Sequence, residues 1–459
     1  MDGLATPQRY LAMTVILLAA ILASMDVTLV NVALPSIVAD LGIEPSRSIW
    51  IVSAFQITAA ISLLPTAALG ERVGYRTVFL SGLVLYTLAA LTSALAPNLT
   101  ALCVSRAAQG LGAGAILSVF PAIVRFTYPE AMLGRAVGWN GLAVMGSAAL
   151  GPVLGVGLLA IADWRWLFAV NVPIGLIALS LGRSLPANPV SHRNIRPISI
   201  ALNAVALISI IMAVKTLPFD HPTGIALIAV FLISGALLVR RERKTAIPLL
   251  PIDLLSNSRF SNALANSICI FSAQMLGFIC LPFFLTQSHR GGWSLALLFG
   301  AWPAASGIVA SFSGRLADRL PGRALCAVGA FVSAAALFVM ADLEAVSLIK
   351  FLALTCLTGA GVGLFVPPNN RTLIVEAPRT RSGAAGGLQA TARIFGQSLG
   401  AALMAIIFPL AGTADAPRTA MAVAASLASA ACLLSLTELV RKRQWKLRPE
   451  TGASTVSGD

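Results

Sequence analysis

Apolar runs of about 20 residues alternate with short polar segments along the whole chain. A helix that crosses the roughly 30 Å hydrocarbon layer of a membrane needs about 20 predominantly apolar residues. The pattern therefore predicts fourteen membrane-spanning helices. They are expected near residues 11–36, 48–69, 77–96, 99–124, 136–160, 165–184, 198–217, 223–240, 259–286, 294–315, 323–341, 346–368, 384–410 and 418–440.

The polar loops between these runs differ in charge. If the N-terminus lies in the cytoplasm, the cytoplasmic loops hold most of the 32 Lys and Arg residues, among them the basic end RKRQWKLR. Loops rich in Lys and Arg stay on the cytoplasmic side of a membrane. We therefore expect a multi-pass protein of the plasma (inner) membrane with both termini in the cytoplasm. The loops also explain the net charge of +14. We therefore expect contact with anionic lipid and no nucleic-acid partner.

Composition agrees with a membrane protein and excludes several function classes. The chain is 57% hydrophobic and 11% charged, whereas a soluble domain carries about 25% charged residues. The fold class is therefore an all-α polytopic membrane protein. The six Cys and three His residues show no metal-ligand spacing, and no phosphate-binding GxxxxGK[ST] loop or Ser-His-Asp set is present. We expect neither an enzyme nor a cofactor or metal site.

One polar loop motif occurs twice, as LGERVGYR (69–76) and LADRLPGR (316–323). Both place an acid, an arginine, a glycine and a second arginine in a short turn, as expected of a transporter built from repeats. We expect two six-helix bundles joined by two extra central helices. The predicted units are an N-terminal bundle (1–190), two linker helices with the start of a cytoplasmic linker (191–245), a C-terminal bundle (246–440) and a basic cytoplasmic tail (441–459).

Five motifs in chain order carry a family resemblance. They are MDVTLVNVALPSI (25–37), LGERVGYR (69–76), RAAQGLGAG (106–114), GSAALGPVLGVG (146–157) and WRWLFAVNVPIG (164–175). With this order and these span positions, the chain resembles the major facilitator superfamily, and within it the fourteen-span drug:proton antiporter family of the EmrB/QacA type. Three positions depart from the pattern: Glu71 stands where Asp is usual, Ala67 where the leading Gly is usual, and Val156 where a second Gly is common.

Asp26 and Arg106 are the proton-coupling candidates. Asp26 lies about 22 Å along the first span and Arg106 about 10 Å along the fourth, which runs the opposite way, so both are expected at similar depth. Burial opposes the charge on Asp26 and a nearby arginine favours it. A carboxyl group balanced in this way can exchange a proton as its access alternates. The alternative is a structural ion pair or a polar contact between helices.

The resemblance implies further roles. Asn31 and Gln109 are candidates for the substrate cavity, although either could be a hydrogen bond between helices. Gly151, Pro152 and Gly155 would bend and pack the fifth span as a gate, or pack it without gating. Arg393 could be functional or could snorkel to the nearer membrane surface. Cytoplasmic latches are expected at Glu71, Arg72, Arg76, Asp318, Arg319 and Arg323.

The sequence therefore predicts a secondary exporter that exchanges protons for hydrophobic, often cationic, small molecules by alternating access. Two alternatives stay open: export of a specific native metabolite, with drugs incidental, and a non-transporting membrane sensor or scaffold. Docking of a periplasmic adaptor is also left open.

Overall fold

The computed structural model describes residues 4–129, 132–187, 196–243, 252–287, 293–342, 348–377 and 382–446. All regular elements within these residues are helical. The α-helices are α1 (Thr6–Leu41), α2 (Pro45–Val73), α3 (Tyr75–Ala94), α4 (Leu99–Thr127), α5 (Leu133–Ile161), α6 (Arg165–Ala169), α7 (Asn171–Ser180), α8 (Pro197–Thr216), α9 (His221–Glu242), α10 (Ile252–Ser256), α11 (Ser258–Gln287), α12 (Trp293–Arg319), α13 (Gly322–Ala341), α14 (Leu348–Val375) and α15 (Ser382–Lys446).

The helices fall on the predicted apolar runs. Eleven described helical segments are long and apolar enough to cross a membrane. Three shorter apolar segments, Gly146–Ile161, Arg165–Ser180 and Leu297–Ser313, occupy the remaining runs. The chain is thus an all-helical, multi-pass membrane protein, and the count of fourteen spans stays a prediction. The predicted unit boundaries near residues 190 and 245, and the tail after residue 446, lie outside the described residues.

Two helices depart from simple rods. α15 carries two predicted spans, joined at Gly412, whose φ of 73° lies in the left-handed region that glycine adopts without a steric penalty. The sixth span is broken into α6 and α7 around Val170. Pro173 lacks the N–H that would bond to the carbonyl of Ala169, so the helix is interrupted there. The break places Asn171 at the start of α7.

The two halves use matching glycine contacts. In the N-terminal half, a Cβ built on Gly112 of α4 would lie 2.7 Å from the carbonyl oxygen of Gly82 on α3. In the C-terminal half, a Cβ on Gly361 of α14 would lie 2.5 Å from the carbonyl oxygen of Gly329 on α13. Only glycine permits so close a backbone approach. The motifs GLGAG (110–114) and GAGVG (359–363) therefore perform the same packing task in both halves.

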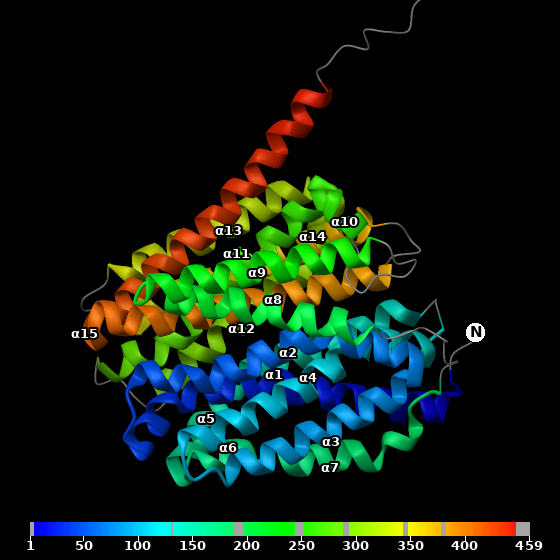
Figure 1. Cartoon of the computed structure of the whole chain (residues 1–459), viewed down its shortest axis with the longest axis horizontal. Coiled ribbons are helices and arrows are strands. Elements are labelled where there is room, and N and C mark those ends of the chain that lie inside the picture. Colours follow the sequence, from blue (N-terminus) through cyan, green and yellow to red (C-terminus); the bar gives the residue numbers. More distant parts are fainter. Residues whose placement is uncertain are drawn as a thin grey trace, which may run out of the picture.

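Helices α8 and α9 lie along the boundary between the halves (Figure 1). α8 packs against α2 and α15, one helix from each half. Lys215 near the end of α8 is 9% exposed and donates a hydrogen bond to Ser53 Oγ at 3.2 Å. Its Nζ also lies 3.5 Å from the centre of the Trp50 ring. These contacts with α2 attach the extra helix pair to the N-terminal half.

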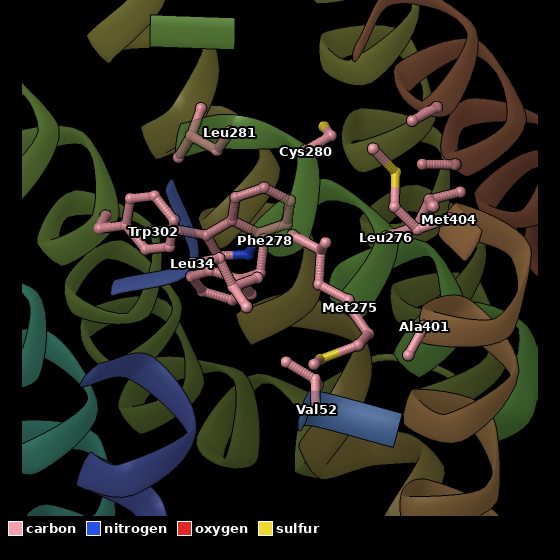
Figure 2. Close-up of a cluster of buried hydrophobic side chains, with 14 of the residues drawn as sticks. Leu34, Val52, Met275, Leu276, Phe278, Cys280, Leu281, Trp302, Ala401 and Met404 are labelled. Carbon is pink, nitrogen blue, oxygen red and sulfur yellow. The ribbon is translucent and has the colours of Figure 1, made fainter. Parts of the chain in front are cut away.

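Apolar contact between the halves is concentrated where α1 ends and α2 begins, the predicted outer side. There one core cluster joins residues of α1 and α2 to residues of α11, α12 and α15. Figure 2 shows Leu34 of α1 beside Phe278, and Val52 of α2 beside Met275. Toward the predicted cytoplasmic side, each half has its own larger cluster, and a small cluster joins Ala59, Ala60 and Leu63 of α2 to Ile394 of α15. The described structure is therefore closed on the predicted outer side.

Candidate functional site

Helix α1 presents polar residues on two faces. Asp26 is 0% exposed and points toward α4, where its partners lie. Ser24, Thr28 and Asn31 recur at helical spacing on another face, which lines a pocket. A change in the tilt or rotation of α1 would therefore move both sites.

Asp26 and Arg106 form a buried ion pair. The Arg106 Nη1 atom donates to Asp26 Oδ2 at 2.6 Å, and both side chains are 1% exposed. Arg106 Nη1 also donates to Gln109 Oε1 at 2.7 Å. Charge-assisted hydrogen bonds of this kind are about twice as strong as neutral ones.

Two amide side chains complete the shell of the carboxylate. Gln109 Nε2 donates to Asp26 Oδ1 at 3.1 Å, and Asn171 Nδ2 donates to the same oxygen at 3.4 Å. Asn171 reaches this position because the helix break at Val170 starts α7 beside α1. Gln109 therefore bridges the acid and the arginine, and it is not among the residues that line the pocket.

Arg106 is held by contacts beyond the carboxylate. Its guanidinium carbon lies 4.4 Å from the centre of the Phe55 ring and 5.7 Å from that of Phe168. Its Nε donates to the carbonyl oxygen of Ile51 at 3.4 Å. The aromatic faces and this carbonyl stabilise the cation at a depth where water is excluded.

The pair has no counterpart in the C-terminal half at the matching helix positions. When the glycine motifs of the two halves are aligned, Gly110 corresponds to Gly359. Thr355 and Thr358 of α14 then correspond in sequence to Arg106 and Gln109 of α4. Both threonines donate to carbonyl oxygens of their own helix. The repeat therefore provides the same glycine-mediated helix packing in both halves. At the aligned positions, the buried charged residue occurs in the N-terminal half and not in the C-terminal half.

A pocket lies between the halves. Its volume is about 530 Å³, including its open mouth. The lining residues are Ser24, Val27, Thr28, Asn31, Ala148, Gln274, Met275, Phe278, Pro303 and Gln397, from α1, α5, α11, α12 and α15. On α5, α12 and α15, the lining residue lies on the predicted cytoplasmic side of the apolar core that joins the halves. The pocket therefore lies next to the closed outer side.

Asn31 is the predicted cavity residue that lines this pocket. It is 1% exposed, and neither its Nδ2 nor its Oδ1 atom has a hydrogen-bond partner among the described residues. An unsatisfied buried polar group costs about 1–3 kcal/mol. A ligand in the pocket could satisfy both atoms at once.

The glycines of α5 allow this helix to pack closely against α1. A Cβ on Gly151 would collide with Thr28, and one on Gly155 would lie 3.2 Å from Leu29 Cδ2. Pro152 is buried inside the same helix. The contact sits directly beside the pocket face of α1, so a movement of α5 against α1 would change the pocket wall.

The structure describes the predicted latches in part. Glu71 and Arg72 are in the last turn of α2, and Gly74, with a φ of 98°, turns the chain toward Arg76 at the start of α3. In the second copy, Arg323 begins α13, whereas the side chains of Asp318 and Arg319 lie outside the described part of the structure. Among the described residues, no group of three or more His, Cys, Asp or Glu could hold a metal ion.

Sequence reasoning missed Asn171 and Phe55 of the charged site, and Gln274 and Gln397 of the pocket. In WRWLFAVNVPIG, an asparagine two residues before Pro173 was a signal for Asn171, since a proline can break the helix and turn the asparagine toward a neighbouring helix. Phe55 and the glutamines Gln274 and Gln397 have no comparable signal, because only the packing of helices decides which face they present.

The comparisons with known proteins agree with this architecture. The chain is 41% identical over 446 residues to the "Uncharacterized transporter YebQ" of Escherichia coli (strain K12), which covers 95% of this chain and 97% of the relative. It is 30% identical over 424 residues to the "Multidrug efflux pump LfrA" of Mycolicibacterium smegmatis (strain ATCC 700084 / mc(2)155). That alignment covers 88% of this chain and 82% of the relative.

A solved structure of a POT family transporter, in complex with a thioalcohol-conjugated peptide, matches the fold with a TM-score of 0.71. The sequence identity is 14%, and the match covers 94% of this chain and 96% of that one, so it shows the fold alone. The family model "Major Facilitator Superfamily" matches residues 16–401 and 263–457. The chain therefore belongs to the major facilitator superfamily and is a secondary transporter, not an enzyme.

Proposed function

We propose that this protein is a proton-coupled exporter of hydrophobic small molecules, built as a fourteen-span antiporter with both termini in the cytoplasm. The observation that carries the proposal is the fully buried Asp26–Arg106 pair on the back of the helix that lines the pocket. Burying an ionisable side chain inside a membrane costs free energy, so such residues usually mark functional sites.

Helix α1 couples proton and substrate. Its pocket face meets the substrate, and its opposite face holds the carboxylate in contact with α4. In the closed-outside state Asp26 is ionised and paired with Arg106. Opening the outer side pulls α1 from its neighbours, gives Asp26 access to external protons and weakens the pair. Protonation then favours release of the substrate and return to the inward state, because a neutral carboxyl group no longer attracts Arg106.

The remaining predicted residues serve the movement between states. Gly151, Pro152 and Gly155 let α5 slide along α1 and seal the pathway on one side. The latch turns at residues 69–76 and 316–323 hold the cytoplasmic ends of the two six-helix bundles in one state. α8 and α9 form the linker between the bundles.

Similarity to the "Multidrug efflux pump LfrA" supports an outward direction of transport and drug-like substrates. The expected preference for cationic compounds has no support in the pocket, because none of its lining residues is acidic. Export of a native metabolite would use the same machinery. A sensor or scaffold would need neither the pocket nor the buried charge.

Transport by everted membrane vesicles tests the proposal. The full chain and its Asp26→Asn variant would be compared with Asp40→Asn, a matched change on the same helix at a carboxylate that is 47% exposed. Uptake of a panel of fluorescent anions and cations would be measured with and without an uncoupler. We expect gradient-driven uptake by the wild type and by Asp40→Asn, and its loss in Asp26→Asn, with the variant still folded in the membrane. Unchanged gradient-driven uptake by Asp26→Asn would overturn the role of Asp26.

A further inference from the structure

Arg393 belongs to the interior of the protein. It precedes Gln397, a pocket residue, by one helical turn of α15, so both lie on one face about 6 Å apart along the axis. On one flank of this face, a Cβ on Gly396 would lie 2.7 Å from the carbonyl oxygen of Ile268 on α11. On the other flank, Ile394 packs against Leu63 of α2. Arg393 therefore points between α11 and α2, toward the predicted cytoplasmic approach to the pocket, and not toward lipid.

The guanidinium is accessible there and has no carboxylate partner among the described residues. Its side chain is exposed, although helices of both halves flank it. Its guanidinium carbon lies 5.3 Å from the centre of the Phe271 ring. Phe271 lies one turn from Gln274, another pocket residue. Arg393 and Phe271 thus extend the pocket by one turn on its open side.

The pocket itself is polar but uncharged. Its lining includes Gln274, Gln397 and the unpartnered amide of Asn31, with Phe278 as the aromatic surface. No lining residue is acidic, and Asp26 is turned away into its pair with Arg106. The charge of Arg393 therefore lies one turn from an uncharged pocket lining, on the predicted cytoplasmic side of the pocket.

We propose that the substrates of this exporter carry a carboxylate or a similar anionic group, which Arg393 binds, on an aromatic body that packs against Phe271 and Phe278. The assignment rests on the proposed export function and names the substrate class of the same pocket. A planar guanidinium suits a carboxylate because it can donate two parallel hydrogen bonds. The positive charge of Arg393 also repels cationic compounds at the entrance, and this repulsion adds to the selectivity for anions.

A pair of probes that differ only in charge tests this assignment. The probes are 7-diethylaminocoumarin-3-carboxylate and its neutral primary amide, with ethidium as a cation. Binding to the purified full chain is measured by fluorescence, and transport is measured in everted vesicles. The variants are Arg393→Gln, which removes the charge, Arg393→Lys, which keeps it, and Arg418→Gln as a control. Arg418 is 51% exposed and pairs with Asp342 away from the pocket.

We expect the wild type to bind the carboxylate more tightly than the amide. Arg393→Gln should raise the Kd for the carboxylate about tenfold and change that for the amide less than about twofold, because one charge-assisted contact is lost. Arg393→Lys should retain part of the preference, and Arg418→Gln all of it.

The outcomes separate this assignment from the proposed function. No preference of the wild type for the carboxylate, or equal preference in Arg393→Gln, overturns the assignment. Gradient-driven transport of ethidium alone also overturns it, while the export function stands. Arg393-dependent binding of the carboxylate without any gradient-driven transport supports the assignment and overturns proton-coupled export.

Discussion

The buried pair of Asp26 and Arg106 allows a quantitative test, because within the described part of the chain each charge is neutralised by the other alone. Arg106 Nη1 lies 2.6 Å from Asp26 Oδ2, and both side chains are 1% exposed. Removing one member of such a pair leaves the other charge buried and unpaired, which costs about 3–5 kcal/mol. Removing both charges leaves no such penalty.

The perturbation is a double-mutant cycle with Asp26→Asn, Arg106→Gln and the double variant. Asp26→Asn also disturbs the amide shell. Gln109 Nε2 donates to Asp26 Oδ1 and Arg106 Nη1 donates to Asp26 Oδ2, and an asparagine amide has one acceptor oxygen in place of these two, so its NH₂ group would face one of the donors. We therefore expect each single variant to lose about 3–5 kcal/mol. The double variant should lose less than the sum by about 2 kcal/mol or more, because neighbouring residues are coupled.

Thermal unfolding of the detergent-purified chain, followed through its seven tryptophans, supplies the assay. The drop in Tm of the double variant should be clearly smaller than the sum of the drops in the two single variants. All three variants should also lose gradient-driven transport. A double variant whose Tm drop equals the sum of the two single drops would refute the argument, since the two charges would then act independently.

Three further predictions concern packing, the linker helices and pH. Gly112→Val should reduce the yield of monodisperse protein in size-exclusion chromatography, because its Cβ would lie 2.7 Å from a backbone oxygen of α3, whereas Gly157→Ala, which meets nothing within 4 Å, should not. Lys215→Met should leave Tm unchanged or raise it, because it removes a buried charge with no acidic partner among the described residues; a clear drop would contradict this. At the start of α9, hydrogen bonds from the hydroxyl and backbone N–H of Thr223 lower the pKa of Asp220. The stability it contributes is therefore present above about pH 4 and lost as pH falls, so Asp220→Ala should speed hydrogen exchange in the first turn of α9 at neutral pH and not in acid.

The sequence by itself determined the elements and their order. Runs of about 20 apolar residues can bury their backbone polar groups only as helices in a membrane, so helix positions followed from composition alone. The depth of Asp26 and of Arg106 also followed, because rise per residue converts position in a span directly into depth. Glycine motifs indicated close helix contacts, since only residues without a large side chain permit them.

Tertiary structure alone decided which faces meet. Gln109 could equally have lined the cavity, but the angle at which α4 packs on α1 turns it into the charged pair. Asn171 reached the same pair through a helix break whose direction no local rule fixes. Asn31 and Arg393 took their places from the way two distant halves pack, and side-chain direction across such an interface depends on rotations and crossing angles that are set by the whole bundle rather than by any one segment.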